Sequence, residues 1–186
     1  MTRPGTLFLA AGLALALIAG CTKQALQATY DKQSAYIESF IQTQLKADTT
    51  ATLRENGGSY RVLVHDTLDV RRDSLREGGL VSLYYACFTL TGNSINRSNL
   101  VATNLKEMAR SVNWNLTDTT RYKPDTLRLD NSVLPGLRNG LLGVQAGDQG
   151  YILFTGKYGY GNTERGMIPA RSALIYQIWI ENVKNE

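Results

Sequence analysis

The hydrophobic positions of the chain change their spacing from one region to the next. Residues 7–19 form an almost purely apolar run. Between residues 31 and 47 the apolar positions recur at helical spacing, which predicts a helix that Asp31 caps. From residue 60 on, short runs rich in Val, Leu, Tyr and Thr alternate with turn residues, as strands do. The pattern predicts an N-terminal helix followed by a sheet-rich body.

The predicted N-terminal helix has one apolar face, made of Ile37, Phe40, Ile41 and Leu45. Residues 22–29 before it are expected to form a tether. The apolar face favours packing on the domain or a spacer between domain and membrane. A partner-binding helix remains an alternative.

In the body, strands are expected at residues 60–64, 80–90, 127–134, 151–155 and 173–183. A loop is expected at 49–58, a helical stretch from Asn99 to about Val112, and a short helix from Pro135 through Val144. A mostly antiparallel sheet with one late helix indicates the α+β class, with the helix packed on one face of a curled sheet.

The first residues are typical of an export signal. Arg3 is basic, and the apolar run after it is too short for an ordinary membrane-spanning helix. The run ends in Ile18-Ala19-Gly20-Cys21, which resembles the lipobox of bacterial lipoproteins. We expect residues 1–20 to be a signal peptide and Cys21 to be lipidated, which would anchor the chain to the envelope. A plain secretory signal or an uncut anchor is the alternative. The residue directly after Cys21 is Thr22 and not Asp, which favours the outer membrane, facing the periplasm.

Charge and reactive side chains narrow the possible functions. The formal net charge is +4, and the basic residues are dispersed, which argues against nucleic-acid binding. Cys87 lies in an apolar run and is expected to be buried and unreactive. His65 is the single histidine, and no Ser/His/Asp set or metal-ligand cluster can be assembled around it. Nucleophilic and metal chemistry are therefore not predicted.

Four sequence motifs together resemble those of a known family. In chain order they are Leu83-Tyr84-Tyr85 with Thr91-Gly92; Val133-Leu134-Pro135-Gly136-Leu137 with Gly140-Leu141-Leu142 and Ala146-Gly147-Asp148; Tyr158-Gly159-Tyr160-Gly161; and Ile168-Pro169 with Ser172-Ala173-Leu174-Ile175-Tyr176. Their residues and gaps are similar to those of FKBP-type peptidyl-prolyl cis-trans isomerases, over residues 58–184. The resemblance implies an FKBP-like curled antiparallel sheet wrapped on a short helix at 58–186, after a tether and N-terminal helix at 21–57, with an insertion at about 98–126.

The resemblance also implies an activity, namely prolyl isomerisation that assists the folding of exported proteins, with no cofactor or metal. It assigns the catalytic cleft to Tyr160, Leu134, Ile168, Tyr85 and Tyr176. It assigns substrate contacts to Val133, Leu137, Ile95, Asn96, Leu127 and Met167. The Tyr160 hydroxyl would donate to a ligand carbonyl, and the Leu134 backbone N–H to the next one. The partners would be proline-containing polypeptides and, through the lipid anchor, a membrane.

The sequence departs from the family pattern at several cleft positions. Leu137 stands where the family has Trp, Ile95-Asn96 where it has Phe-Asp, and Tyr176 where it usually has Phe. These changes predict weak isomerase activity and poor binding of the family's macrolide inhibitors. The alternative function is a degenerate FKBP-like binding or chaperone subunit of an envelope or secretion complex. Within the insertion, Trp114 either pins the segment to the core or replaces a pocket aromatic.

Overall fold

The computed structural model of the chain describes residues 6–65 and 72–185; for residues 6–22 and His65 it describes the backbone alone. The chain divides into two compact units, Met1–Lys32 and Gln33–Glu186. The second unit contains the whole sheet, and the functional residues predicted in the body belong to it.

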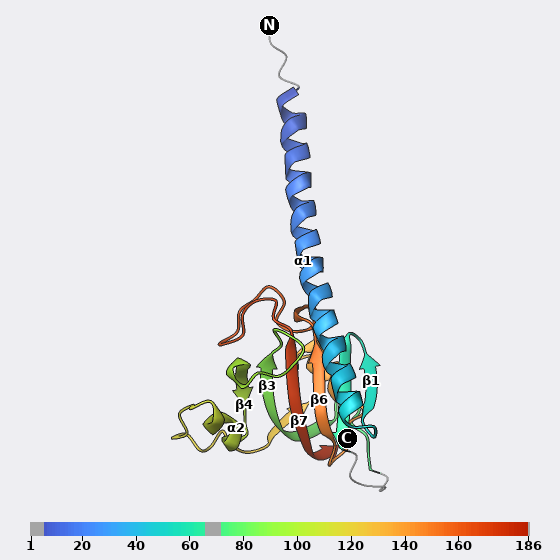
Figure 1. Cartoon of the computed structure of the whole chain (residues 1–186), viewed down its shortest axis with the longest axis vertical. Helices are drawn as coiled ribbons and strands as arrows, with labels where there is room; N and C mark the ends of the chain where they lie inside the picture. Colours follow the sequence, from blue (N-terminus) through green and yellow to red (C-terminus); the bar gives the residue numbers. More distant parts are fainter. Residues whose placement is uncertain (1–5, 66–71, 186) are drawn as a thin grey trace. The chain divides into compact units, whose positions relative to one another are not determined.

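Helix α1 runs from Thr6 to Ala47 without a break (Figure 1). The predicted helix start at Asp31 is therefore wrong, and residues 22–29, predicted to be a tether, are helical. The residues before Asp31 are mostly Ala, Gln and Leu, which favour helix. Asp31 lies inside the helix, where its carboxylate accepts a hydrogen bond from Gln27 Nε2 (2.7 Å). Among the described residues, no helix has both the length and the apolar content that crossing a membrane requires.

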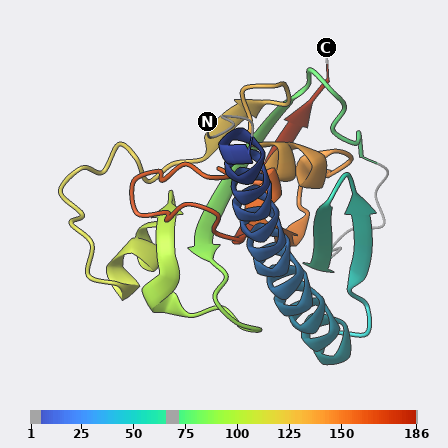
Figure 2. The ribbon, with the colours of Figure 1, turned by 90° about the horizontal axis from the view of Figure 1, so that it is seen from above.

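A seven-stranded antiparallel sheet forms the body (Figure 1). Its strands are β1 (Thr52–Asn56), β2 (Ser59–His65), β3 (Leu80–Thr89), β4 (Leu100–Thr103), β5 (Asp125–Arg128), β6 (Gln149–Phe154) and β7 (Leu174–Lys184). The order is β1-β2-β6-β7-β3-β4, and β5 also pairs with β3. The hairpin of β1 and β2 lies at one edge, and β4 lies at the other, beside helix α2 (Lys106–Ser111) (Figure 2). The α+β architecture predicted from the sequence is confirmed.

Two strands form where none was predicted. β1 occupies the expected loop at 49–58, because Gly57 and Gly58 both adopt positive φ and so allow a tight hairpin turn. β4 occupies the start of the expected helix at 99–112, because residues 100–103 pair with β3 and bury Leu100 and Thr103. Helix in that stretch is limited to α2, and a short 3₁₀ turn at Arg97–Asn99 precedes β4. Pairing with β3 thus outweighed the helical pattern of residues 100–103.

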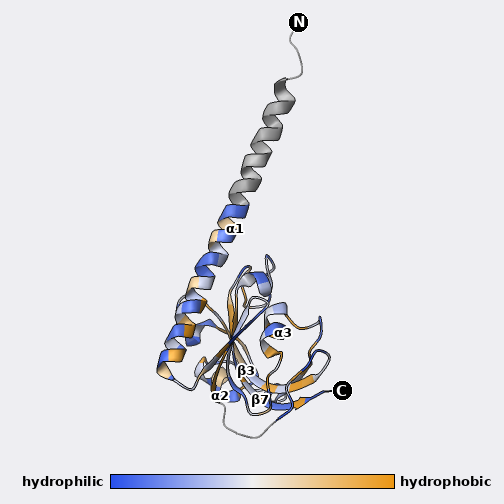
Figure 3. Cartoon of the chain, turned by 90° about the vertical axis from the view of Figure 1, so that its right-hand side faces the viewer, coloured by the Kyte–Doolittle hydropathy of each residue, from blue (hydrophilic) through white to orange (hydrophobic). Residues whose placement is uncertain are grey.

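The sheet has two apolar faces because side chains alternate along its strands. One face packs against helix α3 (Pro135–Leu141) and carries Leu83, Cys87 and Tyr176; we call this the α3 cluster. The other carries Ala86, Phe88 and Ile175 and packs against Ile37, Phe40 and Ile41 of α1; we call this the α1 cluster. Figure 3 shows the two helices on opposite sides of the sheet. The predicted apolar face of the N-terminal helix therefore packs on the domain.

Helix α3 approaches the sheet closely. A side chain at Gly136 would overlap the Phe154 ring, and one at Gly140 would overlap Ile152, so both positions need a residue without a Cβ. Pro135 begins the helix, where its missing N–H costs nothing. Buried Arg61 donates to the carbonyl of Gly140 (3.0 Å) at the other end. These contacts fix the helix that presents Leu134 and Leu137.

Candidate functional site

A cavity of about 140 Å³ opens in the α3 cluster. We call it the aromatic cavity; it is lined by Leu83, Tyr85, Asp125, Leu127, Leu137 and Tyr176. These side chains come from β3, β5, α3 and β7. The structure thus brings together four residues that the sequence assigned to the cleft: Tyr85, Leu127, Leu137 and Tyr176.

Aromatic rings form one wall of the aromatic cavity. The Tyr176 ring lies 5.8 Å from that of Tyr85, at a tilt of 44°, and stacks on Phe154 at 6.0 Å. Burial raises the pKa of Tyr85 to about 12, and it raises the pKa of Tyr176 as well. Both hydroxyls therefore stay protonated and neutral over the physiological range.

Cys87 is the direct cross-strand neighbour of Tyr176 and shares its face of the sheet. The Tyr176 hydroxyl donates a hydrogen bond to the Cys87 sulfur, which raises the pKa of the tyrosine further. Burial raises the pKa of the Cys87 thiol to about 12, so the thiol is protonated and shielded. The predicted burial of Cys87 is confirmed.

Four further predicted residues gather on the same cluster. Val133, Leu134 and Tyr160 are partly buried against it, and Ile168 belongs to it with 7% of its surface exposed. Leu134 is the residue that caps the N-terminus of α3. Burial, followed by the proximity of Cys87, raises the pKa of Tyr160, so its hydroxyl remains a hydrogen-bond donor. The predicted catalytic residues therefore surround one apolar centre.

The loop of residues 156–172, which carries Tyr160 and Ile168, is closed at its base. The Arg171 N–H donates to the Gly161 carbonyl (2.6 Å), and Arg165 and Ile168 exchange backbone hydrogen bonds (2.9 Å each). Gln33 of α1 holds both ends of the loop, because its Nε2 donates to the Arg171 carbonyl (2.6 Å) and its Oε1 accepts from the Gly156 N–H (2.9 Å). One amide from the opposite side of the sheet thus fixes the loop.

Three predicted contact residues lie outside the α3 cluster. Ile95 packs against the α1 cluster, and the Asn96 side chain accepts hydrogen bonds from Ser98, from its N–H (3.0 Å) and its hydroxyl (2.8 Å). Neither residue therefore lies with the other predicted contact residues, because both precede β4, whose pairing with β3 begins only at Leu100. Met167 is exposed and lines a different cavity, described below.

Sequence reasoning missed Leu83 and Asp125. Asp125 is the first residue of β5 and pairs with Leu83, two positions before Leu127 on the same face. Burial raises the pKa of the Asp125 carboxyl, while Lys123 lowers it. A carboxylate thus reaches the cavity from the end of the insertion, and extending the predicted strand at 127–134 back by two residues would have found it.

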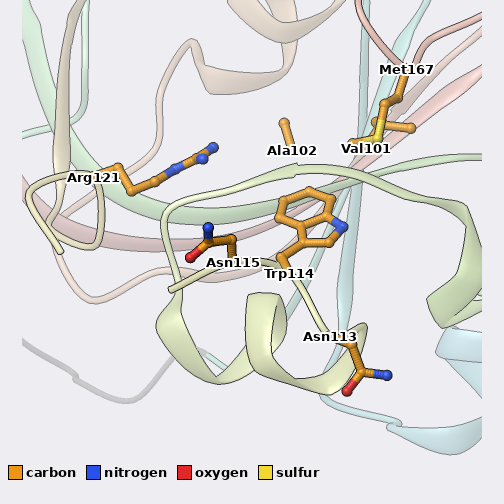
Figure 4. A pocket seen from close by; sticks show the side chains of 7 residues that line it. All are labelled: Val101, Ala102, Asn113, Trp114, Asn115, Arg121 and Met167. Carbon is orange, nitrogen blue, oxygen red and sulfur yellow. The ribbon is translucent and has the colours of Figure 1, made fainter. Parts of the chain in front are cut away.

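A second cavity, of about 480 Å³, lies between the insertion and the loop of residues 156–172. We call it the insertion cavity; it is lined by Val101, Ala102, Asn113, Trp114, Asn115, Arg121 and Met167 (Figure 4). Trp114 packs against the α1 cluster, as expected of a residue that pins the insertion to the core, and it also lines this cavity, which is separate from the aromatic cavity. Val101 and Ala102 pack against the α3 cluster. Burial raises the pKa of Tyr85, and the charge of Arg121 acts in the opposite direction.

Comparison with known proteins places this arrangement in context. The model of the family described as FKBP-type peptidyl-prolyl cis-trans isomerase matches residues 73–181, more than half of the chain. No curated protein matches the chain.

Solved structures share the fold at low sequence identity. The structure of the three FKBP domains of wheat FKBP73 is 17% identical (TM-score 0.55), over 73% of this chain and 52% of that one. FkpA from Escherichia coli is 16% identical (TM-score 0.53), over 98% and 74%. A peptidyl-prolyl cis-trans isomerase from Pseudomonas syringae pv. tomato is 15% identical (TM-score 0.51), over 82% and 96%. The chain spans about half the length of the wheat structure.

Proposed function

The chain belongs to the FKBP-type peptidyl-prolyl cis-trans isomerase family, and from this membership we propose that it isomerises prolyl bonds in polypeptide clients at the aromatic cavity. The observation that carries the proposal is the convergence of Tyr85, Leu127, Leu137 and Tyr176 on that cavity. Tyr160, Leu134 and Ile168 pack around the same apolar centre.

Prolyl isomerisation requires an apolar site that excludes water and fits the twisted amide, and it does not require a nucleophile or a general base. Rotation about the prolyl amide has a barrier of about 18–20 kcal/mol, because amide resonance must be lost. The aromatic wall removes water that would stabilise the planar amide, and a site that fits the twisted form lowers the barrier by differential binding. The Tyr160 hydroxyl and the Leu134 N–H would hold the client carbonyls. Tyr85 stays neutral, so it adds no charge to the cavity.

Leu137 sets the expected strength of this activity. It lies in the floor of the cavity with 7% of its surface exposed, where the family has an indole. A leucine keeps the floor apolar but offers a smaller and more flexible surface for the proline ring. We therefore expect a modest kcat/KM and weak binding of macrolide inhibitors.

The decisive test of the function is an isomerisation assay on the full chain, read by exchange NMR of a proline peptide. We expect Tyr160→Phe and Ile168→Ala each to lower kcat/KM by tenfold or more, while Ser34→Ala, on an exposed position of α1, leaves it unchanged. Wild-type exchange at background, unaffected by either substitution, would refute the enzyme proposal. That outcome would favour the alternative, a binding or chaperone subunit of an envelope complex.

The proposed setting is the cell envelope, where the enzyme would assist the folding of exported proteins. The support for it is the apolar run at 7–19 and the lipobox-like sequence that ends at Cys21. Residues 1–5 and the Cys21 side chain lie outside the described part of the chain. The chain offers a matched control because it has two cysteines. Labelling with a radioactive fatty acid should be lost in Cys21→Ala and retained in Cys87→Ala; labelling retained in Cys21→Ala contradicts the anchor.

A further inference from the structure

The insertion places an aromatic side chain at a backbone-defined position. Helix α2 ends in a Schellman motif, in which Asn113 adopts φ of 58° and its N–H donates to the Arg110 carbonyl (3.0 Å). The Trp114 N–H then donates to the Ala109 carbonyl (3.0 Å). Asparagine tolerates this left-handed conformation better than most residues. The Trp114 ring is therefore a prepositioned wall of the insertion cavity.

Met167 contributes an apolar wall from the other side of the insertion cavity (Figure 4). It is 56% exposed, and among the described residues the other exposed large hydrophobic is Leu53. Its neighbour Ile168 is buried in the α3 cluster, so Met167 is held at the edge of the proposed cleft. A thioether adapts to varied apolar partners, which suits a surface that receives different side chains.

Arg121 adds a positive charge to this apolar space. Its guanidinium extends toward the same opening as Trp114 and Met167 (Figure 4). The guanidinium carbon lies 5.9 Å from the centre of the Tyr122 ring, and the charge also acts on the nearby carboxylate of Asp118, which accepts hydrogen bonds from the Thr120 N–H (3.1 Å) and hydroxyl (2.6 Å). A client carboxylate is the complementary group for such a guanidinium.

The two cavities are close enough for one polypeptide to occupy both. Ala102 lines the insertion cavity and pairs with Cys87 of β3, which in turn pairs with Tyr176, a residue that lines the aromatic cavity. The insertion cavity, at about 480 Å³, lies within the range of roughly 300–1,000 Å³ typical of ligand sites. The aromatic cavity, at about 140 Å³, has room for little more than a small ring.

Resting on the proposed function, we propose that the insertion cavity is a specificity subsite for client residues that flank the proline. It takes an aromatic or long apolar side chain between Trp114 and Met167. Arg121 pairs with a carboxylate of the same segment. The preferred substrate class is therefore a proline segment that is both apolar and acidic, and basic segments are disfavoured.

The test uses the full chain and peptides of one length with a central Xaa-Pro bond. Xaa is Phe or Ala, and the residues that flank the Xaa-Pro dipeptide are either Glu or Lys. We expect the wild type to prefer Glu over Lys peptides by about fivefold at low salt, the upper range for an exposed ion pair. Arg121→Glu should invert this preference. Arg97→Glu, an exposed arginine outside the cavity, should retain it. Met167→Lys, at an exposed position that should not disturb folding, should abolish the preference for Phe over Ala.

Two readouts separate this proposal from the proposed function. Exchange NMR measures isomerisation, and fluorescence titration measures binding of the same peptides. If isomerisation occurs with equal rates on Glu and Lys peptides, or if Arg121→Glu leaves the preference as it was, the subsite is refuted and the isomerase stands. If no peptide is isomerised but binding follows the charge of residue 121, the subsite stands and the isomerase is refuted.

Discussion

The α3 cluster and the α1 cluster share β3, β6 and β7, yet they differ in composition. The buried residues of the α1 cluster are aliphatic side chains and Phe, including Ile37, Ile41 and Phe88, and larger polar aromatics such as Tyr151 pack only at its margin. The buried residues of the α3 cluster include Tyr176 and the Cys87 thiol, and the aromatic cavity opens among them. Polar atoms and empty volume both cost stability in an apolar interior. The comparison suggests that one face of the sheet stabilises the fold while the other forms the site.

The largest effect should come from breaking the α1 cluster. Phe40 is 3% exposed and meets the Tyr151 ring edge-on at 5.1 Å. Phe40→Ala should lower the free energy of unfolding by about 3–5 kcal/mol, measured by urea denaturation. At low temperature, the folded fraction should keep the wild-type kcat/KM. The control is Ser34→Ala on the same helix. If kcat/KM of the folded fraction also fell by a large factor, the α1 cluster would contribute to the activity as well as to stability.

Alkaline pH should act on the α3 cluster selectively. The pKa of Cys87 rises from 9.0 to about 12 on folding, and that of Tyr85 from 10.0 to about 12. Because the folded-state values are the higher ones, their contribution is fully present below pH 9 and is lost as the pH rises toward 12. The free energy of unfolding should fall by about 2 kcal/mol or more between pH 9 and pH 11. In Cys87→Ala, the free energy of unfolding should decrease less over this pH range. The same decrease as in the wild type would contradict the assignment to the thiol.

A larger side chain at the floor of the aromatic cavity should raise the isomerase activity. Leu137→Trp supplies an indole to the floor, and an added aromatic contact is worth about 0.5–1.5 kcal/mol. We expect kcat/KM for a proline peptide to rise roughly twofold to tenfold. Leu53→Trp, on the exposed edge strand β1, is the matched control and should change nothing. A drop in activity with intact folding would mean that leucine fits the client better than an indole does.

The smallest effect is expected from Tyr176→Phe. The substitution removes the hydroxyl that donates to the Cys87 sulfur, which is a weak acceptor. The free energy of unfolding should fall by about 0.5–1 kcal/mol, measured by thermal denaturation. Thiol labelling of the folded protein should also become slower, because that hydrogen bond lowers the pKa of Cys87. Faster labelling would show that the bond protects the thiol.

Local motifs predicted which residues gather in the α3 cluster better than they predicted the chain's element boundaries. The short helix was identified, and Tyr85, Leu137, Tyr160 and Tyr176 come together around it, because their spacing is fixed by a few tight turns and one close helix contact. Ile95 lies apart from these positions, in the α1 cluster, and the local sequence could not indicate this because the register of β4 depends on its pairing with β3. The continuous helix α1 was missed because Asp31 is both a good cap and a tolerable interior residue.

Gln33 has a practical consequence for how fragments of this protein are designed. The family match begins at residue 73, but the compact unit begins at Gln33, whose amide holds the base of the loop that carries Tyr160 and Ile168. A fragment trimmed to residues 73–181 would lose β1, β2 and this amide. Shortened versions should start ahead of residue 33, and inactivity of a shorter fragment would say nothing about the parent protein.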